Sequence, residues 1–124
     1  MIHLDTSSLI DALTGAKRSA PRLRELMAGP EPLAISSIVL FEWLRGPRLP
    51  EEIEAQEILF PKANAVPFGS VEAERAAELY KKVKRPRGRE ADLAIAACAL
   101  TYGAHLWALN KTDFKDIPDL QLLF

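Results

Sequence analysis

The sequence has one cysteine, no excess of charge of either sign, and no apolar run long enough to cross a membrane. Cys98 can form no internal disulfide, and its alanine-rich surroundings indicate a small buried side chain. Sixteen lysines and arginines balance 17 acids, so long-range charge gives no reason to expect non-specific attraction to nucleic acid. The uncharged run 93–109 includes Gly103 and His105 and is shorter than the roughly 20 apolar residues of a membrane span.

The first residues also lack the basic segment that opens a secretory signal, and an acid stands at position 5. We therefore expect a protein of the cytoplasm, with no membrane association. A chain of 124 residues with 48% apolar content is large enough to bury a core without disulfides or a structural metal. The expected organisation is one domain covering residues 1–124.

Short apolar segments alternate with amphipathic ones along the chain. Strands are expected at residues 2–4, 33–35, 64–68, 105–109 and 120–124. Helices are expected at residues 6–13, 19–28, 36–45, 50–60, 70–85 and 90–102, most of them bounded by Ser, Gly or Pro. Pro67 places its strand at an edge or a strand end. This alternation predicts an α/β fold with three layers, in which helices cover a central, mostly parallel sheet of four to five short strands.

In open parallel sheets, functional sites form beyond the carboxyl ends of the strands. Asp5 directly follows the first expected strand, and Asn110 and Asp113 follow the strand at 105–109. These side chains should therefore meet at one edge of the sheet.

Two acids from the first half of the chain stand out, although each also has an ordinary structural explanation. Asp5 ends an apolar strand, where it could equally serve as a helix N-cap or a turn residue. Glu42 lies inside an apolar helix between Phe41 and Trp43, where an ionised carboxylate is costly unless it is paired. A salt bridge to Arg45 would provide that pairing.

Two acids from the second half have similar alternatives. Asp92 begins the apolar helix at 90–102, where a first-turn acid also stabilises the helix dipole. Asp113 lies in a loop after a strand, where a turn-forming aspartate is common. Considered together, Asp5, Glu42, Asp92 and Asp113 are four carboxylates from separate segments that the fold brings toward one edge.

Gathered carboxylates repel one another, so such a cluster requires shifted protonation or a bound cation. A ligand set of oxygens alone favours Mg²⁺ or Mn²⁺ over Zn²⁺. His3 and His105 are isolated strand residues without the spacing of a zinc site. A divalent ion of this kind binds phosphate oxygens and activates water, so the cluster points to phosphodiester hydrolysis.

Four motifs in this order resemble the PIN-domain ribonucleases, specifically the VapC toxins of toxin–antitoxin pairs. The motifs are Met-Ile-His-Leu-Asp-Thr-Ser at the start, Phe-Glu-Trp-Leu-Arg-Gly at 41–46, Ala-Asp-Leu-Ala-Ile-Ala-Ala at 91–97 and Leu-Asn-Lys-Thr-Asp-Phe at 109–114. The resemblance implies that Asp5, Glu42, Asp92 and Asp113 are the catalytic, metal-binding acids. It also implies that Thr6 and Asn110 support them by orienting a ligand or a water molecule.

The resemblance further implies a homodimer and a small VapB-like antitoxin that covers the acids, often by inserting an arginine. Arg45 and the basic stretch 81–89, with Arg87 and Arg89, are candidate contacts to RNA or antitoxin. The stretch can equally be a helix end matched to its dipole and followed by a solvated loop. One position departs from the family pattern: Ala108 stands where a Thr or Ser hydroxyl is usual, which bears on support of the metal.

The sequence thus leads to the hypothesis of a Mg²⁺- or Mn²⁺-dependent endoribonuclease, the toxin of a VapBC-type pair. One alternative is a weakly catalytic or non-catalytic module that binds an antitoxin through the acid cluster. Another is a metal-dependent DNA nuclease or phosphatase on the same fold. The RNA target and the number of metal ions do not follow from the sequence.

Overall fold

The computed structural model describes residues 1–123 and is built around a parallel three-stranded sheet. The strands are β1 (Ile2–Leu4), β2 (Leu33–Ala34) and β3 (His105–Trp107), with β1 in the centre of the order β2-β1-β3. Ile2 lies opposite Leu33 on one side and His105 on the other. Because all the strands run the same way, the residues that follow β1 and β3 emerge at the same edge.

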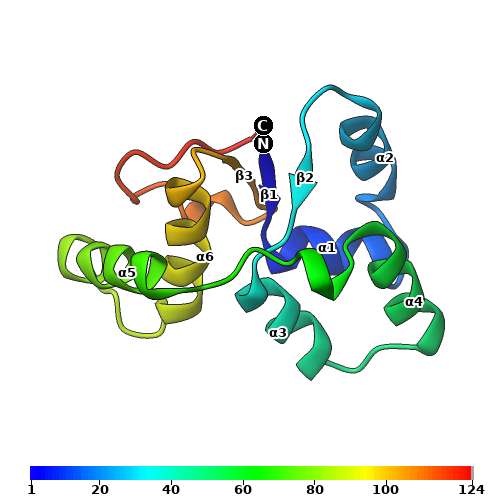
Figure 1. The fold of residues 1–124 in the computed structure, drawn as a ribbon, viewed down its shortest axis with the longest axis horizontal. Coiled ribbons are helices and arrows are strands. Elements are labelled where there is room, and N and C mark those ends of the chain that lie inside the picture. Colours follow the sequence, from blue (N-terminus) through cyan, green and yellow to red (C-terminus); the bar gives the residue numbers. More distant parts are fainter. Residues whose placement is uncertain (124) are drawn as a thin grey trace.

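Helices cover both faces of this sheet, as Figure 1 shows. The helices are α1 (Thr6–Leu13), α2 (Ala20–Ala28), α3 (Ser37–Arg45), α4 (Pro50–Leu59), α5 (Ser70–Lys82) and α6 (Glu90–Thr101), with short 3-10 turns η1 (Lys62–Asn64) and η2 (Lys111–Asp113). In the figure, α5 and α6 lie beside β3, and α1 to α4 lie on the other side. The predicted three-layer α/β/α class is confirmed.

The most deeply buried helix is α6, in which the seven consecutive residues from Leu93 to Ala99 are all buried. Four of the seven are alanine, and such small side chains let α5, α3 and β3 pack closely around the helix. Cys98 is fully buried in this run, as expected. After the helix, Gly103 adopts a positive φ of 62° and turns the chain toward β3.

The expectation of four to five strands is wrong, because two expected strands are reduced to single bridges. In the segment expected at 64–68, only Val66 bridges, to Ser36, since Pro67 has no N–H to extend the ladder. In the segment expected at 120–124, Leu122 bridges Leu106, and residue 124 lies outside the described residues. The strand expected at 105–109 is also shorter and ends at Trp107.

No helix in residues 1–123 has the length and apolar character needed to cross a membrane. The structure divides the uncharged run 93–109 mainly between α6 and β3.

Candidate functional site

Asp5 is held at the carboxyl end of β1, where it caps the N-terminus of α1. Its carboxylate accepts a hydrogen bond from the Ser7 hydroxyl over 2.7 Å and from the Ser7 backbone N–H over 3.4 Å. Burial is the main cause that raises the pKa of this carboxyl above its ordinary value, the Ser7 bonds oppose the rise, and Glu42 adds to it. Asp5 is therefore the N-cap of α1, as the structural alternative proposed, and it also interacts electrostatically with Glu42.

Ser7 is a residue that the sequence reasoning missed. Besides donating to Asp5, its hydroxyl accepts the backbone N–H of Leu109 over 3.3 Å. One hydroxyl thus joins the acid after β1 to the loop after β3. A short side chain with both donor and acceptor capacity is the only sequence signal for this role, and the strand order was needed to find its second partner.

Glu42 lies half-buried on α3 and is bonded on both sides. Its Oε1 accepts the Thr6 hydroxyl over 2.6 Å, and its Oε2 forms a salt bridge of 3.3 Å with Arg45 one helical turn later. The salt bridge considered as the structural alternative is therefore present. The Thr6 bond also ties α3 to the start of α1, directly beside Asp5, so Thr6 lies where a supporting polar group was expected.

Asp92 lies in the first turn of α6 and has the clearest electrostatic signature of the four acids. Its pKa is raised to about 6, first by burial and then by the charges of Asp5, Asp113 and Glu42, while Arg89 opposes the rise. Each of the three acids comes from a different segment. The structure therefore brings all four predicted carboxylates into one electrostatic neighbourhood, the acid cluster.

Asp113 is the most open of the four acids and ends η2. Its carboxylate accepts the side-chain N–H of Asn110 over 2.7 Å, which closes a turn within the loop. Both residues are exposed. The turn-forming alternative is correct here too, and Asn110 orients the acid itself.

The acid cluster does not form a finished coordination sphere. Within residues 1–123, no three His, Cys, Asp or Glu side chains are placed to hold one metal ion. Three of the carboxylates accept hydrogen bonds from Ser7, from Thr6 and from Asn110. The donor chemistry nevertheless suits a hard cation. The side-chain donors are all oxygens, and burial together with the charges of Asp5, Asp113 and Glu42 raises the Asp92 pKa, a cost that a bound cation would relieve.

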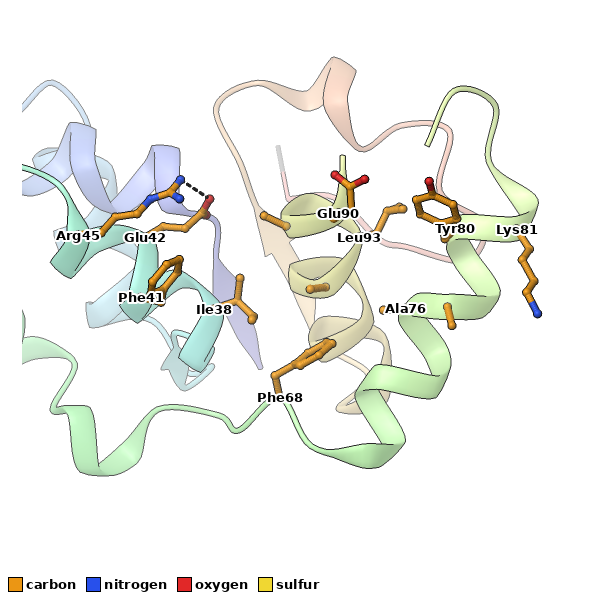
Figure 2. A pocket seen from close by; sticks show the side chains of 13 residues that line it. Ile38, Phe41, Glu42, Arg45, Phe68, Ala76, Tyr80, Lys81, Glu90 and Leu93 are labelled. Atoms are coloured by element: carbon orange, nitrogen blue, oxygen red, sulfur yellow. Dashed lines mark hydrogen bonds and ion pairs between the residues drawn. The ribbon is translucent and has the colours of Figure 1, made fainter. Parts of the chain in front are cut away.

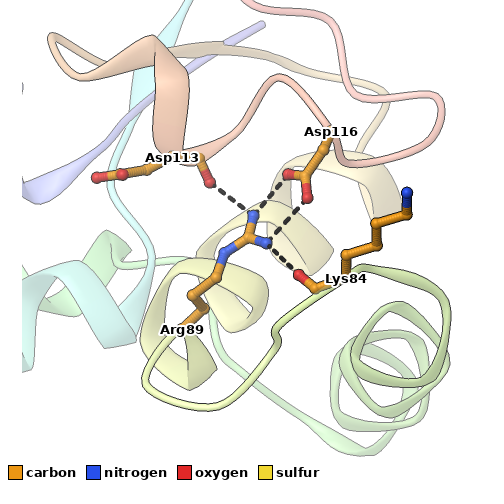
Figure 3. A network of polar contacts seen from close by, with 4 residues as sticks. All are labelled: Lys84, Arg89, Asp113 and Asp116. Atoms are coloured by element: carbon orange, nitrogen blue, oxygen red, sulfur yellow. Dashed lines mark hydrogen bonds and ion pairs between the residues drawn. The ribbon is translucent and has the colours of Figure 1, made fainter.

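The three arginines that were candidate contacts to RNA or antitoxin have different surroundings. Arg45 is exposed, pairs with Glu42 and lies over the Phe41 ring at 5.3 Å from its centre. Arg87 is exposed in the loop between α5 and α6. Arg89 is turned inward to Asp116, Asp113 and Lys84 (Figure 3). The proposal that Arg87 and Arg89 both face substrate therefore suits the geometry of Arg87 better.

His3 is buried two residues before Asp5, and burial lowers its pKa to about 4. Its ring lies 5.9 Å from that of Tyr102, measured between centres. The imidazole is therefore neutral at pH 7 and packs in the core.

An apolar groove of about 580 Å³ opens beside the acid cluster, between α3, α5 and α6 (Figure 2). Glu42 and Arg45 lie at one end of it, and the exposed residues Phe41 and Tyr80 line its walls. Composition and periodicity do not reveal such a groove, because it depends on how three helices diverge.

Comparisons with known proteins agree with this architecture. The PIN domain family model matches residues 2–120. Ribonuclease VapC19 of Mycobacterium tuberculosis is 34% identical over 95% of both chains. Among solved structures, VapBC2 from Rickettsia felis, bound to a promoter DNA fragment, superposes with a TM-score of 0.78 at 26% identity, covering 99% of this chain and 98% of that one. VapBC-1 from nontypeable Haemophilus influenzae gives 0.73 at 27% identity, covering 99% and 97%. The chain therefore belongs to the PIN-domain family, and within that family it is similar to VapC-type proteins.

Proposed function

We propose that this protein is a divalent-metal-dependent endoribonuclease and the toxin of a VapBC-type pair. The observation that carries the proposal is that four acids from four segments lie close enough to interact electrostatically. Three of them contribute to raising the pKa of the fourth, Asp92, to about 6. The naming of its 34%-identical relative as a ribonuclease supports RNA as the substrate. Because RNA and its translation are cytoplasmic, we place the activity in the cytoplasm.

We assign Asp5, Glu42, Asp92 and Asp113 to holding the cation, which we take to be Mg²⁺ or Mn²⁺ because the donors are all oxygens. When bound, such an ion neutralises charge on the phosphate and activates water for attack.

The residues around the acids have their own tasks. Thr6 and Ser7 donate hydrogen bonds that restrict the rotation of Glu42 and Asp5 and so fix the position of each carboxylate. Asn110 does the same for Asp113. With Ala108 in place of the usual hydroxyl, Ser7 is the side chain that links Asp5 to the loop after β3. Arg45 and Arg87 are exposed and available to RNA phosphates.

We further propose a VapB-like antitoxin partner that occupies the apolar groove beside Glu42. Several similar structures are toxin–antitoxin complexes, including one from Klebsiella pneumoniae at 26% identity. Exposed Phe41 and Tyr80 offer aromatic anchors, and the acids at the end of the groove would receive a basic side chain. A homodimer, which the family resemblance implies, is part of the same proposal.

The direct test is cleavage of RNA, single-stranded DNA and small phosphoesters in Mg²⁺, in Mn²⁺ and in EDTA. The proposal predicts RNA cleavage with either metal and none in EDTA. Cleavage of DNA alone would favour the DNA-nuclease alternative and contradict RNA as the substrate.

A second candidate function is a non-catalytic module that binds an antitoxin. The observation favouring it is that no three acids in residues 1–123 stand ready to hold a cation. Tight complex formation with antitoxin and no cleavage in any metal would establish this alternative.

A further inference from the structure

The guanidinium of Arg89 joins three segments of the chain, as Figure 3 shows. Its Nη1 and Nη2 donate to the two carboxylate oxygens of Asp116 over 2.9 and 2.6 Å. Nη2 also donates to the backbone carbonyl of Asp113 over 2.9 Å, and Nη1 donates to that of Lys84 over 3.2 Å. These bonds use all the hydrogen-bonding capacity of the two terminal nitrogens. We call this set of contacts the Arg89 clamp.

The Arg89 clamp connects two segments that carry acids of the cluster. Arg89 directly precedes α6, and its own carbonyl accepts the N–H of Leu93 over 2.9 Å, so its backbone belongs to the helical turn that carries Asp92. Its side chain holds the backbone at Asp113, and Asp116 lies three residues further along. This one side chain therefore connects the segment that carries Asp92 to the segment that carries Asp113.

The same contacts make direct RNA binding by Arg89 costly. A phosphate could reach the terminal nitrogens only by displacing Asp116 or a backbone carbonyl, and a planar bidentate arginine–carboxylate pair is a strong, directional contact. Arg89 is also the less exposed partner of that pair, at 21% against 43% for Asp116.

We propose that Arg89, held by Asp116, is a positioning residue that sets Asp113 relative to Asp92 and thereby strengthens divalent-cation binding by the acid cluster. This inference rests on the function proposed above. A purely electrostatic role would have the opposite sign, because a positive charge near the cluster repels a cation and its removal should tighten cation binding. The direction of the effect therefore separates positioning from charge.

The test is calorimetric titration of the full chain with MnCl₂, comparing wild type with Arg89→Gln. Loss of a group that orients ligands typically weakens metal binding at least tenfold, so we expect the Kd for Mn²⁺ to rise about tenfold. The matched control is Arg75→Gln, which removes the same charge from an exposed side chain on α5. The control should bind Mn²⁺ as tightly as wild type, or slightly more tightly.

A second variant, Asp116→Asn, keeps Arg89 and its charge while breaking the bidentate pair. It should also weaken Mn²⁺ binding, and the double variant Arg89→Gln/Asp116→Asn should bind no more weakly than Arg89→Gln, because both changes remove the same clamp. Equal or tighter Mn²⁺ binding by folded Arg89→Gln would overturn this inference and leave the nuclease proposal intact. A wild-type chain that binds no Mn²⁺ would overturn both.

Discussion

The acid cluster divides into two pairs that are built differently, and we name them after the elements that carry them. The buried half is Asp5 and Asp92, on the central strand and the buried helix, and the exposed half is Glu42 and Asp113, of which Glu42 is itself half-buried. Asp5 is 6% exposed at the end of the central strand, and Asp92 is half-buried at the start of the most deeply buried helix. Glu42 lies on the outer helix α3 and Asp113 in an exposed loop, each bonded to an exposed partner. We infer that the buried pair supplies fixed charge and that the exposed pair adjusts around a ligand.

The largest effect is expected from neutralising the buried half. Asp5→Asn and Asp92→Asn should each reduce metal-dependent RNA cleavage on the order of 10²- to 10³-fold, because each removes a fixed charge facing the cation. Initial cleavage rates of folded protein at saturating Mg²⁺ measure this. Asp119→Asn, an exposed aspartate in the C-terminal segment, is the control and should cleave like wild type. Undiminished activity in both site variants would remove the mechanism.

Neutralising the exposed half should have a smaller effect. Glu42→Gln and Asp113→Asn keep their hydrogen bonds to Thr6 and Asn110 in altered form, so we expect losses of about 10- to 100-fold, partly recovered at high Mg²⁺. Cleavage rates as a function of Mg²⁺ concentration test this prediction. If these variants were as impaired as Asp92→Asn and showed no recovery, the distinction between the two halves would be wrong.

Activity should fall as the pH is lowered, because Asp92 in the buried half becomes protonated. Asp92 has a pKa of about 6, so it gains a proton below that pH and loses the charge that attracts the cation. The rate at subsaturating Mg²⁺ should therefore drop about tenfold for each pH unit well below 6. The midpoint should move to lower pH as Mg²⁺ is raised, because the cation competes with the proton. A rate independent of pH between 5 and 7 would contradict this assignment.

The smallest expected effect is on folding stability. Ionisation of Asp92 should lower stability, whereas it raises activity. The folded-state pKa of Asp92 is about 6 against an ordinary value of 3.8, so the folded protein binds this proton more tightly than the unfolded chain. Stability due to this group is therefore lost as pH rises from about 4 to 6, and ionised Asp92 destabilises the protein at pH 7.

Asp92→Asn should accordingly be more stable than wild type at pH 7.5, on the order of 1 to 2 kcal/mol after allowing for the partial exposure of the side chain. At pH 4 the difference should nearly vanish. Urea unfolding at both pH values measures it, with Glu90→Gln as a matched control that neutralises an exposed acid in the same helical turn. A variant less stable than wild type at pH 7.5 would show that the carboxylate is not strained by its neighbours.

The division between the buried and exposed halves of the acid cluster also explains which parts of the site the sequence predicts well. Asp5 follows an apolar strand, and Asp92 lies in the first turn of an apolar helix. Both elements can be recognised from their own residues, so the positions of these two acids can be predicted without knowing the rest of the fold. The helices at 6–13, 36–45 and 90–102 have clear apolar runs with Ser caps or a Gly end, and the structure has helices there within two residues of the expected bounds.

What the sequence does not predict depends on contacts between distant segments. Ser7 reaches Leu109 only because β1 and β3 are neighbours. Arg89 is one of several basic residues in its stretch, and its bond to Asp116 follows from how the loop after η2 folds back. The segments around Val66 and Leu122 contain apolar residues and therefore resemble strands in the sequence. In the structure each segment pairs through a single residue only.

The most direct test of the account is the pKa of the Asp92 carboxyl, measured by carbon-detected NMR with and without saturating Mg²⁺. We expect a pKa near 6 in buffer without metal, a lower pKa in Asp5→Asn, and a downward shift of more than about one unit when Mg²⁺ binds. An ordinary pKa near 4 in every sample, unaffected by Mg²⁺, would show that the four acids do not share a cation site.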